Sequence, residues 1–262
     1  MTIIKRSPLI AFTLITFTFS WGFWLPQALH SQGYIETGNM LWGFGSFGPS
    51  IAGIIVIALT GGKAGLKSMW LRLLDWKVKL KWYLFIFLFP PLIILIALQT
   101  HRLAGGLVPS LITIENLALI IPTFFLVLVL GGPLNEELGW RGFMLPHLLK
   151  TSGSFKAASI VGVGWAVWHL PLFWISGASQ EGIPAGAVLL QILALSYIFT
   201  WLYNRTRGSL VIPLLFHATL NTSGAIMPIL PAQADSLQPY LITVALAVVF
   251  ALSLAAATRG RL

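Results

Sequence analysis

The stretch LALIIPTFFLVLVLGGPLNEELGWRGFML, residues 117–145, decides how the fold of this chain is interpreted. It begins as an apolar run and ends in a segment that holds Glu136, Glu137 and Arg141 within six residues. The chain as a whole is similarly apolar: 57% of its 262 residues are hydrophobic, only 9% are charged, and the mean hydropathy is +0.87. The fold must therefore accommodate both an apolar body and a dense cluster of charge.

Several other apolar stretches approach or exceed the roughly 20 residues that a helix needs to cross the hydrocarbon core of a bilayer. Eleven Trp residues fit this composition, because indole rings favour the interface between lipid and water. The sequence predicts an all-α, polytopic membrane protein that forms a single multi-span domain over residues 1–262. About eight transmembrane helices are expected, at 8–29, 40–59, 82–98, 115–134, 157–176, 185–203, 209–229 and 239–257. The sequence FPP, residues 89–91, predicts a kink or a break in the third span.

The distribution of basic residues predicts how the spans are oriented. With the N-terminus in the cytoplasm, fifteen of the sixteen Lys and Arg residues lie on the inner side, and only Arg102 lies outside. The outer loops carry Glu36, Glu115, Glu181 and Asp235. We therefore expect both termini in the cytoplasm. The net charge of +9 follows from this topology and from contact with anionic lipid headgroups, so nucleic acid is not an expected partner.

The basic segment 60–81 has two interpretations that the sequence leaves open. It holds six of the basic residues together with Leu, Met and Trp. This composition suits an amphipathic helix that lies on the inner leaflet, and it equally suits a solvated basic loop.

The charged cluster at residues 136–141 favours a functional site at the inner end of the fourth span. Ionisable residues within membrane helices are costly and are functional hypotheses by default. Glu137 and Arg141 are four residues apart, so in a helix they share a face and can pair. Glu136 is rotated by about 100° from Glu137 and is left free to face a cavity. In the alternative interpretation, Asn135 caps a cytoplasmic helix and both carboxylates only stabilise its first turn.

Polar residues in two other spans favour the functional interpretation. His169 lies among bulky apolar residues in the fifth span, with Trp165 one turn earlier on the same face. His217 and Asn221 in the seventh span are four residues apart and project to one side. Imidazole, amide and carboxylate groups can hold a divalent metal with an open position for water. They can also form a metal-free site in which a carboxylate activates water and the other groups stabilise an oxyanion. The absence of cysteine excludes thiol nucleophiles and Cys-ligated zinc.

These residues resemble the motifs of the CPBP family of intramembrane proteases, which includes type II CAAX-prenyl endopeptidases and bacteriocin-processing or immunity proteins. The family pattern E-E-x-x-x-R is matched by Glu136, Glu137 and Arg141. The pattern F-x-x-x-H is matched at His169, although its first position is Trp165. The pattern H-x-x-x-N/D is matched by His217 and Asn221. The motifs occur in the family's order on separate spans, over a core of about 120–225.

The resemblance implies a peptidase that hydrolyses a peptide bond of a membrane-associated peptide or protein. It implies that Glu136 activates the attacking water, with Glu137 and Arg141 in support. It also implies that His169, His217 and Asn221 bind a metal such as zinc or stabilise the oxyanion; both mechanisms stay open. We expect the protein in a bacterial cell membrane with its site open to the cytoplasm.

For these groups to meet, the fourth helix must run on deeper with the motif, or the spans must tilt, or water must enter from the inner side. The sequence LGGPL, residues 130–134, suits a bend that turns the carboxylates inward. Trp165 in place of Phe bears on the shape of the pocket.

Two other functions are compatible with the sequence. A transporter could use intramembrane Glu, His and Arg as a proton relay, although no repeated halves with paired broken helices are found. A bacteriocin-immunity type protein of the same fold could bind a peptide without cutting it. Substitution of Glu136 separates these functions, because only the peptidase needs that carboxylate for bond cleavage.

Overall fold

The computed structural model describes residues 3–109 and 114–262, which form helices joined by loops, with no strand within these ranges. The α-helices are α1 Ile3–Arg6, α2 Pro8–Ser31, α3 Gly48–Leu73, α4 Leu80–Leu103, α5 Ile114–Leu130, α6 Pro133–Gly139, α7 Leu145–Leu149, α8 Ser154–Trp168, α9 Ala185–Arg205, α10 Val211–Ile226, α11 Pro231–Ala234 and α12 Gln238–Ala257. Three further helical turns are η1 Trp42–Phe47, the π-helix η2 Trp140–Met144 and η3 Leu170–Trp174. The prediction of an all-α fold is confirmed.

The apolar helices confirm a polytopic membrane protein. Six helices of the described chain are long and apolar enough to cross a bilayer, and the bent pair Ala118–Leu130 and Pro133–Leu149 makes up to seven. Each of the eight expected spans coincides with a helix or a helix pair, and the span expected at 209–229 corresponds to α10, which has 16 residues. The number of spans and their orientation in the membrane stay predictions.

Two local features differ from a simple set of straight spans. Helix α4 runs without interruption through Pro90 and Pro91, so the expected break at this point is not found. Transmembrane helices tolerate Pro because neighbouring groups satisfy the freed backbone atoms. Helix α3 contains a non-helical residue, Gly62, with φ of 57° and ψ of −151°. After Gly62 the basic segment is helical to Leu73, with Met69 buried. The helical interpretation therefore fits residues 63–73, and the loop interpretation fits the residues that directly follow.

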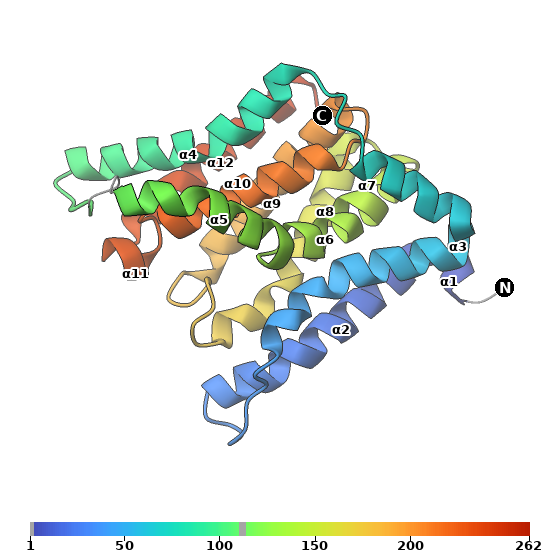
Figure 1. The fold of residues 1–262 in the computed structure, drawn as a ribbon, viewed down its shortest axis with the longest axis horizontal. Helices are drawn as coiled ribbons and strands as arrows, with labels where there is room; N and C mark the ends of the chain where they lie inside the picture. The colour runs from blue at the N-terminus through green and yellow to red at the C-terminus, as the bar shows by residue number, and fades with distance from the viewer. Residues whose placement is uncertain (1–2, 110–113) are drawn as a thin grey trace.

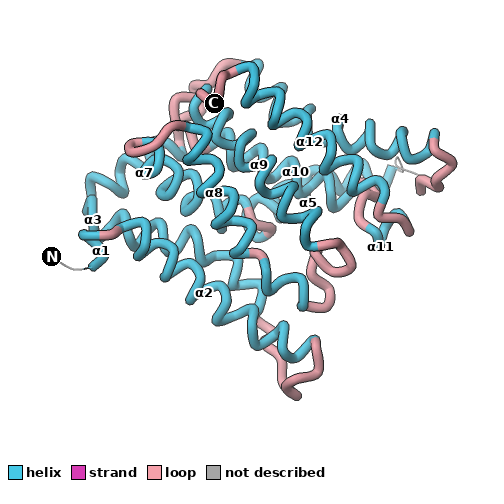
Figure 2. The backbone as a smooth tube through the Cα atoms, turned by 180° about the vertical axis from the view of Figure 1, so that it is seen from behind, coloured by secondary structure: helices cyan, strands magenta, loops and turns pink. Residues whose placement is uncertain are grey.

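The helices form two groups that meet at one end of the molecule and diverge toward the other (Figure 1). In one group α2 packs along α3, and in the other α10 packs against α4 and α5. Helices α8, α9 and α12 pack in sequence and connect the groups. Both termini lie near the end where the groups meet, as the view from behind also shows (Figure 2).

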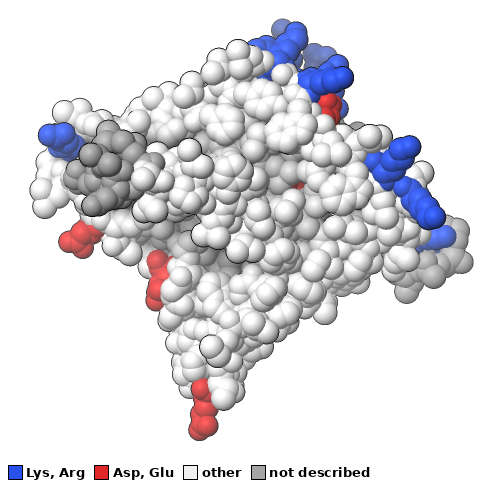
Figure 3. Space-filling model, viewed as in Figure 1, with Lys and Arg blue, Asp and Glu red and all other residues white. Residues whose placement is uncertain are grey.

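Charged side chains follow the same division. Most Lys and Arg residues lie around the end that holds the termini, whereas Asp and Glu lie mainly at the tips of the diverging helices (Figure 3). Glu36, Glu181 and Asp235 are exposed in loops at those tips. The molecule therefore has a basic end and an acidic end, which is the asymmetry expected of a chain that obeys the positive-inside rule.

Helix α6 is held deep in the molecule by a close approach to α3. A Cβ atom at Gly139 would collide with the backbone of Pro49, so the two helices can approach this closely only because residue 139 is glycine. The hydroxyl of Ser50 also donates a 2.8 Å hydrogen bond to the carbonyl of Leu134. These contacts fix the helix that carries both carboxylates of the charged cluster.

Candidate active site

The chain bends between α5 and α6, as residues 130–134 predict. The two segments of the bent pair differ in direction by 41°, and Gly132 at the break has φ of 113°. Helix α6 therefore starts at Pro133, and Asn135 does not cap it. The amide of Asn135 instead donates to the hydroxyl of Ser46 at 3.0 Å and to the carbonyl of Leu130 at 3.2 Å. The alternative in which Asn135 caps a cytoplasmic helix is wrong.

Both glutamates of the cluster are buried, Glu136 with 5% and Glu137 with 0% of its surface exposed. The predicted pair is confirmed, because Nη1 of Arg141 donates to Oε1 of Glu137 at 2.9 Å. Arg141 is also fully buried, and its guanidinium lies over the rings of Trp165 and Phe199, at 4.4 and 4.0 Å from their centroids. It belongs to the π-helix η2, a rare form that often marks functional sites.

The two histidines are held through their Nδ1 atoms. Nδ1 of His217 lies 2.8 Å from Oε1 of Glu137, so one carboxylate oxygen holds both Arg141 and His217. Nδ1 of His169 lies 2.8 Å from the backbone carbonyl of Trp165. A carbonyl or a carboxylate only accepts, so each histidine donates from Nδ1, and Nε2 is left for other partners.

Glu136 lies at the point where these groups converge. Its Oε2 accepts a 2.6 Å hydrogen bond from the indole Nε1 of Trp165. A methyl group added at Gly132 would lie 2.7 Å from Oε1 of Glu136, 3.4 Å from Nδ2 of Asn221 and 3.5 Å from Nε2 of His217. Three polar groups from two helices therefore surround one small space beside the backbone of residue 132.

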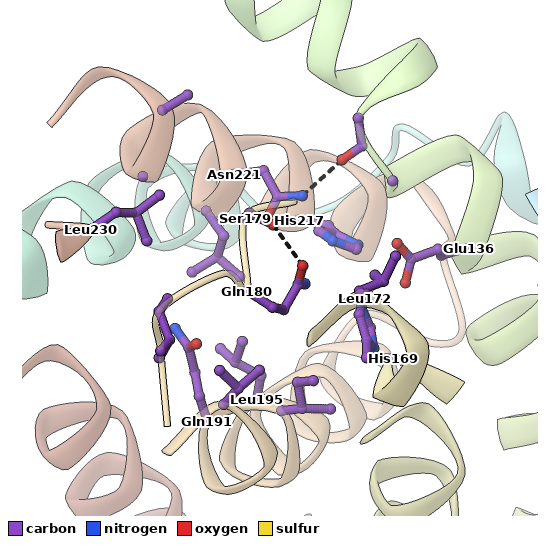
Figure 4. A pocket seen from close by; sticks show the side chains of 18 of the residues that line it. Glu136, His169, Leu172, Ser179, Gln180, Gln191, Leu195, His217, Asn221 and Leu230 are labelled. Atoms are coloured by element: carbon purple, nitrogen blue, oxygen red, sulfur yellow. Dashed lines mark hydrogen bonds between the residues drawn. The ribbon is translucent and has the colours of Figure 1, made fainter. Parts of the chain in front are cut away.

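This space is part of a cavity of about 540 Å³, within the size range of small-molecule sites. Figure 4 shows Glu136, His169, His217 and Asn221 together at one side of the cavity. Nδ2 of Asn221 donates one hydrogen bond to the carbonyl of Gly131 at 2.8 Å. Most of the remaining lining is apolar, and helices α4, α9, α10 and α12 contribute part of it.

The cavity extends away from the basic end of the molecule. Its lining includes Trp42, Gln180 and Leu230, which belong to segments at the tips of the diverging helices. Its deep end is formed by Glu136 and His217, which lie nearer the middle of the helical body.

All six predicted site residues lie at the deep end of the cavity or support it directly. Glu136, His169, His217 and Asn221 line the cavity, while Glu137 and Arg141 lie behind them. Two further contributors were noted in the sequence but not predicted as site residues: Gly132, whose conformation shapes the site, and Trp165, whose N–H binds Glu136. For Trp165, the available signal was that this sequence has Trp where the family pattern has Phe.

Among the side chains that the structure describes, no cluster of three His, Cys, Asp or Glu residues that could hold a metal ion is found. Zinc at catalytic sites is typically held by three side chains of His, Asp, Glu or Cys. The alternative that His169, His217 and Asn221 bind a metal includes an amide ligand, and it stays a prediction.

Comparison with known proteins places these residues in context. Residues 118–223 match the model of a family described as type II CAAX prenyl endopeptidase Rce1-like. Over 237 residues, 86% of each chain, the sequence is 27% identical to CAAX prenyl protease 2 of Methanococcus maripaludis. The matched segment contains every residue of the candidate site, from the break before α6 to Asn221 in α10.

Proposed function

We propose that this chain is a peptidase of the CPBP family and that it hydrolyses a peptide bond of a membrane-associated peptide or protein inside the cavity described above, because its sequence is similar to type II CAAX prenyl endopeptidases. The observation that carries this proposal is the convergence of Glu136, His217 and Asn221 on one small space. Peptide hydrolysis needs a positioned water, a general base and groups that stabilise an oxyanion. The residues around this space can supply all three functions.

In the proposed reaction, Oε1 of Glu136 takes a proton from a water molecule, and the water oxygen attacks the peptide carbonyl carbon. Asn221 has a second amide hydrogen, which it can donate to the oxyanion that forms. His217 and His169 offer Nε2 on the same side, and an imidazolium at 217 paired with Glu137 would also donate to the oxyanion. Glu136 then returns the proton to the amine that leaves, and the peptide bond breaks.

Product analysis tests this proposal. The purified protein, reconstituted in liposomes, is incubated with a library of membrane-associated peptides in water enriched in ¹⁸O, with and without a metal chelator. We expect new peptide ends that carry ¹⁸O in their carboxylate. Peptides that are bound but remain intact would favour the binding protein, and the chelator reaction tests the metal-dependent alternative.

Substitution of Gly132 by Ala is expected to reduce hydrolysis by about 100-fold or more, since a misplacement of about 1 Å in a reacting group can cost this much. The added methyl group would occupy the space beside Oε1 of Glu136, and φ of 113° is unfavourable for alanine. Initial rates of peptide cleavage measure the effect.

Gly33→Ala is the matched control, because Gly33 also has a positive φ, of 77°, but a Cβ there meets nothing within 4 Å. Both variants carry backbone strain, and only the one at residue 132 fills the site. Equal activity of the two variants would contradict the proposed position of the reacting atoms.

The structure also bears on the side of the membrane that the site faces. The sequence predicts cytoplasmic termini and a site open to the cytoplasm, but the cavity extends away from the end that holds the termini. We therefore propose that only one of these two expectations holds. We give more weight to the prediction of cytoplasmic termini, because it places fifteen of the sixteen basic residues on the inner side. The proposed substrate accordingly enters from the side of the membrane opposite the cytoplasm.

Single cysteines test this orientation cleanly, since the chain has no cysteine of its own. In intact bacterial cells, a membrane-impermeant maleimide should label Glu181→Cys, beside the cavity mouth. It should label Lys67→Cys, at the basic end, only after the membrane is made permeable. The reverse pattern would place the cavity mouth in the cytoplasm.

A further inference from the structure

Trp165 has more contacts with the candidate site than a packing residue needs. Its side chain is 3% exposed, and its indole N–H donates to Oε2 of Glu136 at 2.6 Å. One face of its ring carries the guanidinium of Arg141, and the ring packs in a T-shaped arrangement with that of His217, at 5.6 Å between centroids. Its backbone carbonyl accepts the hydrogen bond from His169. Trp165 thus contacts four residues of the candidate site.

The hydrogen bond from Trp165 is not a general consequence of burying tryptophan in this protein. Among the described residues, the buried indoles of Trp24, Trp140 and Trp168 have no hydrogen-bond partner for Nε1. The core therefore holds these three indoles without a protein acceptor for their N–H groups. At position 165, by contrast, the N–H is directed at a buried carboxylate.

The chemistry of the indole gives this contact a consequence for Glu136. An indole N–H only donates, so the oxygen that it holds must remain an acceptor. While the bond is made, a lone pair of Oε2 is engaged by the N–H, which favours Oε1 over Oε2 as the oxygen that takes up a proton. Oε1 is the oxygen that lies beside Gly132, Asn221 and His217.

We propose that Trp165 is a positioning residue for the reaction: its N–H holds Oε2 of Glu136 so that Oε1 alone exchanges protons with water and with the leaving amine. This inference rests on the proposed function, because it assumes that Glu136 is the general base. The inference adds Trp165 to the proposed mechanism, as a side chain that acts through Glu136. Its contribution comes from one N–H group, which phenylalanine at this position could not supply.

Removal of this N–H with the ring retained tests the inference. Two variants lose the N–H donor. One is Trp165→Phe. The other, the benzothienyl variant, carries β-(3-benzothienyl)alanine at position 165 and keeps the size and shape of indole. Hydrogen bonds to charged groups contribute enough to predict a fall in kcat of about 10- to 100-fold. We expect KM to stay within about twofold, because the bond orients the base and does not bind substrate.

Trp140→Phe is the matched control, since Trp140 is equally buried, lacks a partner for its N–H and lies outside the described cavity lining. It should keep the wild-type kcat and KM. If Trp165→Phe does not fold, the benzothienyl variant decides alone. Wild-type kcat in that variant, or an equal fall in kcat for Trp140→Phe and Trp165→Phe, would overturn the inference.

The same set of assays separates failure of this inference from failure of the proposed function. Full activity of a Glu136→Gln variant would show that Glu136 is not the general base, and the proposed mechanism would then be wrong. Loss of activity in Glu136→Gln together with full activity of the benzothienyl variant would leave the mechanism intact and remove only the role of Trp165.

Discussion

Glu136→Gln is expected to lower the rate of peptide hydrolysis by about 10²- to 10⁴-fold, the range typical for loss of a general base. The amide has the size of the carboxylate, and its oxygen can still accept the hydrogen bond from Trp165. It cannot take a proton from water at neutral pH. Initial rates, measured by mass spectrometry of the peptide products in liposomes, give the size of the loss.

Glu181→Gln provides the control for the loss of a carboxylate as such. Glu181 lies in an exposed loop next to Gln180 of the cavity lining, and it accepts a hydrogen bond from the backbone of Gly177. We expect this variant to cleave at the wild-type rate. Both variants should elute as folded protein with unchanged thermal unfolding. Cleavage by Glu136→Gln at the wild-type rate would show that another group activates the water.

The helices of this fold could be predicted from sequence because the apolar runs leave few alternatives. In lipid every backbone polar group must be satisfied within the segment, so a long apolar run forms a helix. The expected span at 8–29 corresponds to α2, and that at 239–257 corresponds to α12. Of the kink or break predicted at Pro90 and Pro91, the break is not found, since the local rule that proline ends helices is weaker in transmembrane segments.

The composition of the site was also readable, but its geometry was not. Spacing of four residues predicted that Glu137 meets Arg141, and the structure confirms this pair. Spacing within one helix says nothing about contacts between helices. The bond from Trp165 to Glu136 joins α8 to α6, and the contact of His217 with Glu137 joins α10 to α6. Both depend on the depth of α6.

The depth of α6 and the direction of the cavity come from tertiary packing. The bend at Gly132 and the close approach of Gly139 to Pro49 set how far α6 enters the body. The sequence LGGPL permitted such a bend without fixing its angle. The direction in which the cavity opens follows from the divergence of whole helix groups, to which no short motif corresponds (Figure 1).

Arg141→Met is expected to lower the free energy of unfolding by about 3–5 kcal/mol, the usual effect of breaking a buried ion pair from one side. Arg141 and Glu137 are both fully buried and lie 2.9 Å apart. Methionine fills the space of the arginine stem but leaves the carboxylate of Glu137 with a single partner, His217. Unfolding in mixed detergent micelles, followed by the near-ultraviolet signal of the buried tryptophans, measures the loss.

The double variant Glu137→Gln with Arg141→Met separates charge from packing. It removes both buried charges, so most of the lost stability should return, as replacement of whole buried pairs is often neutral. Arg205→Met, at an exposed position, controls for loss of a positive charge and should leave stability unchanged. Wild-type stability of Arg141→Met would contradict the prediction. If the double variant were as unstable as the single one, the stacking of the guanidinium on Trp165 and Phe199 would be the main contribution of Arg141.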